Sequence, residues 1–118
     1  MFKFEKLEVW QNAIELADTV YTVTRAFPAE ERFGLTNQMR RAAVSVSSNI
    51  AEGSSCLSNV DFARFVEIAT GSLFEVVSEA IVAKRQKFLE DQELARIYQA
   101  AETEGRMLSG LRRTLLGN

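Results

Sequence analysis

A sequence of 118 residues corresponds to one domain, so we expect residues 1–118 to fold around a single core. Hydrophobic residues make up 47% of the chain and charged residues 25%, which is ordinary for a globular protein. A net charge of −2 argues against a dedicated nucleic-acid binder, for which a strongly basic balance is expected. No apolar segment approaches the ~20 residues that cross a bilayer, and the first residues lack the apolar core of a signal peptide.

The chain contains one cysteine, Cys56, and no histidine. A lone cysteine cannot form an intrachain disulfide, which fits a reducing compartment. We therefore expect a cytoplasmic protein that does not associate with membranes. Because the commonest general base and metal ligand is missing, we predict neither a metal site nor a cofactor.

Apolar residues recur at three- and four-residue spacing, and the whole chain has only six glycines and one proline, so a mostly helical protein is expected. The first predicted helix covers residues 6–25 and ends before Pro28, because a residue that precedes proline avoids the helical conformation. Its predicted apolar stripe consists of Trp10, Ala13, Ile14, Ala17, Val20, Tyr21 and Thr24. Pro28 begins a single turn that Gly34 closes in a left-handed conformation. The second predicted helix covers residues 35–52, with Gly53 as the left-handed residue that follows it.

Two longer helices are predicted in the second half of the chain. One covers residues 59–84, with Ser58 as its N-cap, and the other begins at residues 90–92. The predicted core stripe of this last helix consists of Leu94, Ile97 or Tyr98, Ala101, Gly105, Leu108, Leu111 and Leu115. Four helices with short connections imply antiparallel neighbours and hence an all-α, up-down-up-down four-helix bundle. The helix over 59–84 is apolar around more than half of its circumference, whereas a bundle helix needs a stripe of only ~100°. The surplus side chains, Ile68, Phe74, Val77 and Ile81, therefore predict burial against another subunit.

Gly71 and Gly105 lie inside predicted helices, where each costs about 1 kcal/mol relative to alanine. Close approach of two backbones is the usual compensation. We therefore expect Gly71 and Ser72 to face the small residues 42–45 of the second helix.

Polar residues at helical spacing on the second and third helices form a candidate interaction cluster. Its members are Arg40, Arg41, Ser45, Asn49, Glu52, Ser72 and Glu75. The first interpretation is structural: one arginine pairs with Glu52 or Glu75, the other extends to solvent, and the network specifies register and oligomeric state. The alternatives are an anion or phosphate contact through the arginines, or a catalytic carboxylate pair, Glu52 and Glu75, if one of them is desolvated. No activated nucleophile accompanies these residues, which disfavours an enzyme.

Two basic clusters complete the candidate residues: Lys84, Arg85 and Lys87, and Arg106, Arg112 and Arg113. Cations near helix C-termini complement the helix dipole, which is their simplest role. The alternative is that oligomer symmetry repeats one cluster into a phosphate-binding rim.

Several blocks of the sequence resemble one bacterial family. They are Leu7-Glu8-Val9-Trp10, Phe33-Gly34-Leu35, Arg40-Arg41-Ala42-Ala43, Asn49-Ile50-Ala51-Glu52-Gly53 and Gly71-Ser72-Leu73. In this order they resemble the four-helix-bundle family first recognised in open reading frames within intervening sequences of 23S ribosomal RNA genes. The resemblance implies an up-down bundle that assembles into a ring-like homo-oligomer, commonly a pentamer, and a biochemical function that is mostly unassigned.

The relatives that this resemblance implies include accessory proteins of diversity-generating retroelements, which are basic and bind nucleic acid and a reverse transcriptase. This chain is acidic, with a pI near 5.2, and has Ser54-Ser55-Cys56 where the family often carries an arginine. We therefore predict a non-enzymatic, homo-oligomeric assembly or interaction protein. The alternative is an accessory protein that binds RNA or DNA through Arg40, Arg41 and basic residues repeated around the oligomer.

Overall fold

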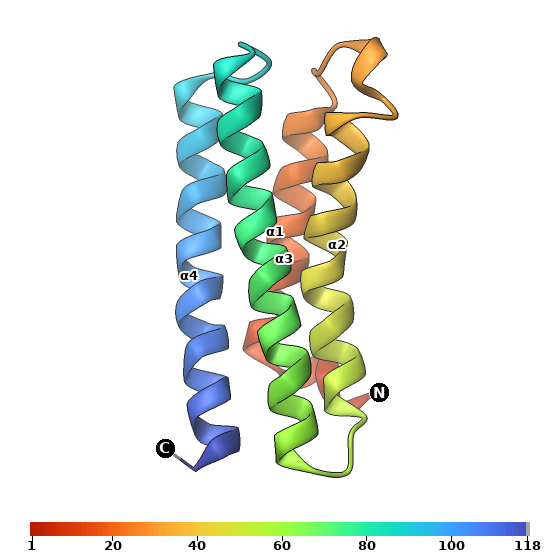
Figure 1. Ribbon diagram of the computed structural model, residues 1–118, viewed down its shortest axis with the longest axis vertical. Helices are drawn as coiled ribbons and strands as arrows, with labels where there is room; N and C mark the ends of the chain where they lie inside the picture. Colours follow the sequence, from red (N-terminus) through yellow and green to blue (C-terminus); the bar gives the residue numbers. More distant parts are fainter. Residues whose placement is uncertain (118) are drawn as a thin grey trace.

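The computed structural model describes residues 1–117, which contain helices and no strand. The elements are η1 (Lys3–Lys6), α1 (Glu8–Thr24), η2 (Ala29–Glu31), α2 (Leu35–Ser54), α3 (Asn59–Arg85) and α4 (Asp91–Leu116). The four α-helices alternate in direction along a rod of 43 × 23 × 21 Å (Figure 1). Both α1 and α3 pack against α2 and α4, which is the cyclic arrangement of a four-helix bundle. None of the described helices has both the length and the apolar character needed to span a membrane.

Local signals in the sequence set most helix ends. The Ser58 hydroxyl accepts a hydrogen bond from the Asp61 amide at 3.1 Å and caps α3, as predicted. The Glu90 amide donates to Glu93 Oε1 at 2.8 Å at the start of α4. The single turn predicted after Pro28 is η2.

Two glycines predicted as left-handed helix stops have other roles. Gly34 is the N-cap of α2 with φ −106°, and Gly53 lies inside α2, which continues to Ser54. A β-carbon on Gly53 would lie 2.8 Å from Phe65 Cβ and 2.8 Å from Phe62 Cδ1 of α3. The predicted stop at Gly53 is therefore wrong: the close contact between α2 and α3, rather than helix termination, requires glycine at this position.

Gly71 shows the opposite error. It is exposed, and a β-carbon added to it would have no atom within 4 Å, so the predicted close backbone approach at Gly71 is wrong. Its neighbour Ser72 does face α2, where the Ser72 and Ser45 hydroxyl oxygens lie 2.8 Å apart. Since successive residues of a helix point about 100° apart, Gly71 does not share the side of α3 that Ser72 presents to α2.

The core lies between the four helices, and its largest fully buried apolar side chains are Leu16, Met39, Ile50, Ile97 and Leu108. The predicted apolar stripe of α1 is rotated relative to the observed one. Leu16 and Val23 are buried, whereas Tyr21, predicted in the stripe, is exposed. The difference arises because α1 contacts α2 on one side and α4 on the other, so that its buried arc is centred between these two neighbours.

Candidate interaction surfaces

Three members of the predicted polar cluster come together between α2 and α3. Asn49 Nδ2 donates to the Ser45 carbonyl at 2.8 Å and lies 3.0 Å from Ser45 Oγ. Ser45 Oγ in turn lies 2.8 Å from Ser72 Oγ across the helix–helix contact. Each hydroxyl in this partly buried contact therefore has a partner, and the pair favours the antiparallel register in which residue 45 lies opposite residue 72.

The two arginines of the cluster have different environments. Arg40 Nε donates to Thr24 Oγ1 at 2.9 Å, and its guanidinium lies 4.5 Å from the centre of the Tyr21 ring. Arg41 is exposed and lines a shallow groove with Asn37 and Ser45. Within residues 1–117, no ion pair includes either arginine. The predicted arginine pairing with Glu52 or Glu75 is therefore not formed, because α1 supplies the partners of Arg40.

Glu75 lies in a polar groove of about 380 Å³ between α2 and α3. The groove is lined by Asn37, Gln38, Arg41, Ala42, Ser45, Ser72, Glu75 and Glu79. Burial, followed by repulsion from the Glu75 carboxylate, raises the pKa of Glu79. Glu79 Oε1 is buried without a hydrogen-bond partner among the described residues. Sequence reasoning missed Glu79, although its four-residue spacing from Glu75 was a usable signal.

Glu52 does not belong to this groove. The register of Ser45 and Ser72 places Glu52 opposite residue 65, which is roughly 15 Å along α3 from Glu75 at 1.5 Å per residue. Glu52 is also exposed. The catalytic pair of Glu52 and Glu75, one of the alternatives considered for the sequence, is therefore not assembled.

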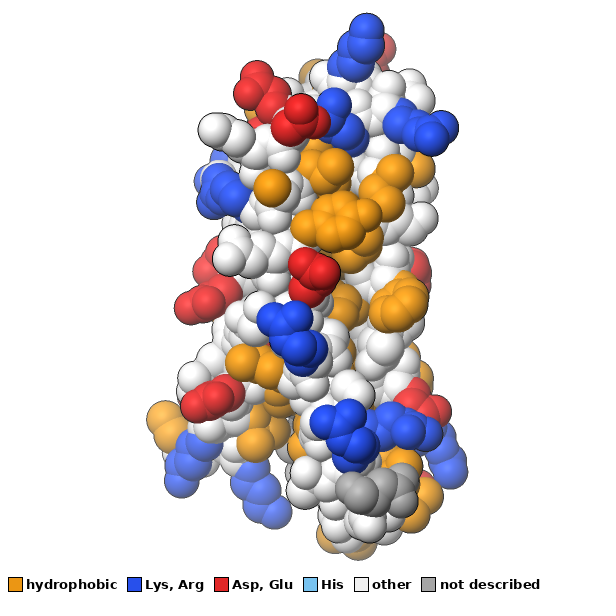
Figure 2. Space-filling model, turned by 90° about the vertical axis from the view of Figure 1, so that its left-hand side faces the viewer, with side chains coloured by type: hydrophobic (Ala, Val, Ile, Leu, Met, Phe, Trp, Pro, Cys, Tyr) orange, Lys and Arg blue, Asp and Glu red, His pale blue; other side chains and the backbone are white. Residues whose placement is uncertain are grey.

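A second groove, of about 430 Å³, runs between α3 and α4 and is mostly apolar. It is lined by Leu73, Phe74, Val77, Ser78, Ile81, Tyr98, Ala101, Glu102 and Gly105. Figure 2, which faces the α4 side, shows hydrophobic side chains gathered in the upper half of this surface. Phe74 is 69% exposed beside the groove. The sequence predicted the α3 wall, but the α4 wall was missed because Tyr98 and Gly105 were assigned to the core stripe.

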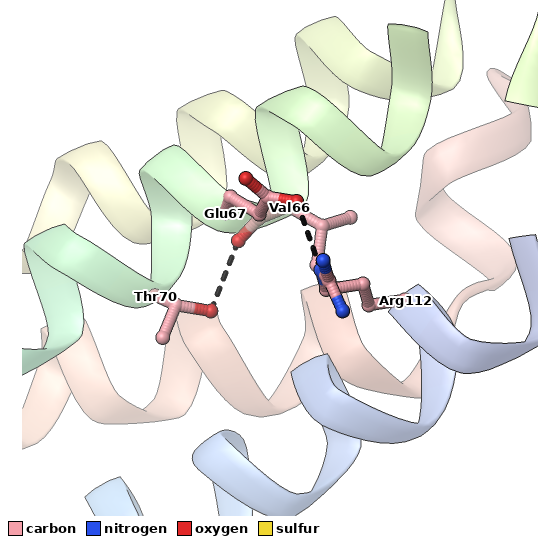
Figure 3. A network of polar contacts seen from close by, with 4 residues as sticks. All are labelled: Val66, Glu67, Thr70 and Arg112. Atoms are coloured by element: carbon pink, nitrogen blue, oxygen red, sulfur yellow. Dashed lines mark hydrogen bonds and ion pairs between the residues drawn. The ribbon is translucent and has the colours of Figure 1, made fainter. Parts of the chain in front are cut away.

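Beyond Gly105, Leu108 remains in the core, and an ion pair joins the exposed edges of α3 and α4. Arg112 Nε donates to Glu67 Oε2 at 2.8 Å, close to the Thr70 hydroxyl that donates to the Val66 carbonyl at 3.0 Å (Figure 3). In the first basic cluster, Lys84 is similarly paired with Asp91 at 3.2 Å. One member of each predicted basic cluster is thus neutralised within the subunit.

The sequence model of the 23S rRNA-intervening sequence protein family matches residues 5–110, a range that contains both grooves. The chain belongs to this family. Its fold is similar to the crystal structure of a protein of unknown function from the S23 ribosomal protein family of Bacteroides thetaiotaomicron VPI-5482. The two share 18% sequence identity with a TM-score of 0.79, over 89% of this chain and 98% of that chain. No curated protein matches the chain.

Proposed function

We propose that this member of the family is a cytoplasmic, non-enzymatic assembly protein whose subunits associate through the α3/α4 groove. The observation that carries the proposal is the exposed Phe74 ring beside an open apolar groove. Full burial of a side chain of this size favours association by roughly 1.5–3 kcal/mol relative to exposure. The lone Cys56 fits a reducing compartment.

A second copy of the chain is the occupant that best suits this groove. Gly105 leaves part of the α4 wall without a side chain, and Phe74 projects beside it, so each copy offers both a hollow and an aromatic ring. Glu102 at the rim and Arg106 one turn further along α4 are both exposed and carry opposite charges that can pair between copies. We propose a closed ring, with five subunits as the family resemblance implies, in which the α3/α4 groove of each subunit contacts a different surface of the next copy. Such heterologous contacts close into a ring, whereas contact of one groove with another would give a two-fold dimer.

Nucleic-acid binding has less support than assembly. Arg40 is engaged by Thr24 and Tyr21, which leaves Arg41 as the exposed arginine of the candidate cluster. Lys84 and Arg112 are ion-paired within the subunit. The chain carries 14 basic and 16 acidic residues, so the negative charges offset the remaining cations. A strongly positive surface that would attract the phosphates of a nucleic acid is therefore not expected.

Replacing Phe74 with glutamate tests the assembly surface. We expect the wild-type mass in light scattering to be a multiple of 13.2 kDa, and the Phe74→Glu variant to fall to a single subunit with its helical circular dichroism retained. The matched control is Phe33→Glu, because Phe33 is 84% exposed but precedes α2, outside the groove. A monomeric wild type, or an unchanged mass for Phe74→Glu, would contradict the proposed surface.

The same measurement with short RNA and DNA tests the alternative function. We expect no change in mass at low or high salt. A gain of mass at low salt that disappears at high salt and weakens in Arg41→Ala would instead favour nucleic-acid binding.

A further inference from the structure

Glu104 of α4 is a carboxyl group that the proposed assembly surface does not use. Its side chain is 0% exposed, and Ala101 and Leu108, one turn before and after it, are buried as well. Glu104 Oε1 accepts a hydrogen bond from Asn12 Nδ2 of α1 at 3.0 Å (donor to acceptor). Glu104 Oε2 is buried and has no hydrogen-bond partner among the described residues. Within residues 1–117, one neutral donor is therefore the only hydrogen-bond partner of the Glu104 carboxyl group.

This environment suits a protonated carboxyl and not an ionised one. An isolated charge buried among apolar side chains is strongly unfavourable, and no ion pair among residues 1–117 involves Glu104. Burial raises the pKa of Glu104 to about 7, against the opposing effect of the Asn12 hydrogen bond.

Charged residues on the two helices that pack against α4 do not compensate Glu104. On α1, Glu8 and Glu15, the charged residues on either side of Asn12, are exposed. On α3, the contact of Leu73 with Gly105 places Glu75 level with Glu104, and Glu75 is exposed and lines the groove against α2. Glu67, further along α3, is exposed and paired with Arg112. None of these groups contributes to the raised pKa of Glu104. The protonation state of the side chain therefore depends on whether water reaches it.

We propose that Glu104 and Asn12 form a proton-operated latch between α1 and α4, which is closed while the Glu104 carboxyl is protonated and loosened when it ionises. A carboxylate needs several hydrogen-bond donors, and beyond Asn12 only water can supply them. Because Glu104 is fully buried, water reaches it only when neighbouring helices separate, and we place this separation at the Asn12 contact between α1 and α4. Because Ala101 and Gly105 of the same helix line the α3/α4 groove, loosening also alters the assembly surface, a consequence that rests on the proposed function.

The sign of the pH dependence follows from the two states. The unfolded chain releases the Glu104 proton near the ordinary value of 4.5, whereas the folded chain holds it to about pH 7, so the folded-state pKa is raised. Between these values the unfolded state binds fewer protons, and stability falls as the pH rises. Below the unfolded pKa the full stability is present, and above the folded pKa the loss is complete.

The Glu104→Gln variant, a neutral side chain of the same shape, tests this dependence. Urea unfolding, followed through the fluorescence of Trp10 at one protein concentration, measures the unfolding constants of the variant and the wild type from pH 5 to pH 8. We expect the ratio of the wild-type to the variant unfolding constant to rise about tenfold per pH unit up to about pH 7 and then level off. The matched control Glu15→Gln should give a constant ratio because Glu15 is exposed. A constant ratio for Glu104→Gln overturns the proposal.

Two further readouts distinguish a latch from a static buried acid. The side-chain carbon resonance of Glu104 should titrate near pH 7, and Asn12→Ala should move this midpoint upward because a hydrogen bond that lowers the pKa is lost. The ratio of the wild-type to the Glu104→Gln rate of amide hydrogen exchange in α1 and α4 should rise from pH 5 to about pH 7 and stay constant above it. A ratio that does not change with pH, or titration near 4.5, contradicts the latch. These readouts do not require an oligomer, so failure of the assembly proposal leaves them interpretable.

Discussion

Replacing Gly53 with alanine is expected to destabilise the protein by about 2–3 kcal/mol, although alanine is the better helix former. The added β-carbon would lie 2.8 Å from Phe65 Cβ, an atom fixed to the backbone of α3. Relief therefore requires α2 and α3 to move apart, which also strains the contact between Ser45 and Ser72. Urea unfolding of the variant and the wild type measures the change in the free energy of unfolding.

The same substitution at Gly71 is the matched control. Gly71 also lies inside a long helix, but a β-carbon there would meet no atom within 4 Å. Gly71→Ala is therefore expected to stabilise the protein by about 0.5–1 kcal/mol through helix propensity alone. If both substitutions stabilise the protein, the close contact of α2 with Phe62 and Phe65 does not exist as described.

Truncation of Leu16 to alanine is expected to cost about 3 kcal/mol. Leu16 is fully buried on α1, where the helix faces both α2 and α4. The loss combines the lost transfer free energy of the side chain with the cavity that a packed core cannot fully close. Thermal or urea unfolding with Trp10 fluorescence measures the effect.

Leu57 provides a control with the same chemical change. It lies in the connection between α2 and α3, and its side chain is fully exposed. Leu57→Ala should change the free energy of unfolding by no more than about 0.5 kcal/mol. Similar losses at the two positions would mean that α1 is rotated toward the predicted stripe, which placed Ala13 and Ala17 but not Leu16 in the core.

Much of the fold was predictable from the sequence because the relevant signals act over a few residues. Ser58 marks the start of α3, Pro28 marks the turn after α1, and the apolar spacing locates all four helices. The family was also recognisable, since the Asn49–Gly53 block and the other matching segments are continuous stretches of sequence. The same helical spacing predicted that Ser45, Asn49 and Ser72 belong to one polar cluster, and these three residues are hydrogen-bonded to one another.

The partners of individual side chains were decided by the tertiary structure. Tyr21 and Thr24 engage Arg40 in place of Glu52 or Glu75, and the α4 wall of the apolar groove appears only once α3 and α4 are placed together. Each of these outcomes depends on how far a helix is rotated about its axis and shifted along its neighbour. Rotation and shift are set jointly by contacts far apart in sequence, so helical spacing alone does not determine them.

The sequence by itself determined the four helices, most of their ends and the family. Only the tertiary structure decided that Gly53 is crowded while Gly71 is open, and that Glu104 is buried beside Asn12. The physical reason is that helix formation depends on local backbone and capping preferences, whereas crowding and desolvation depend on which faces of separate helices meet.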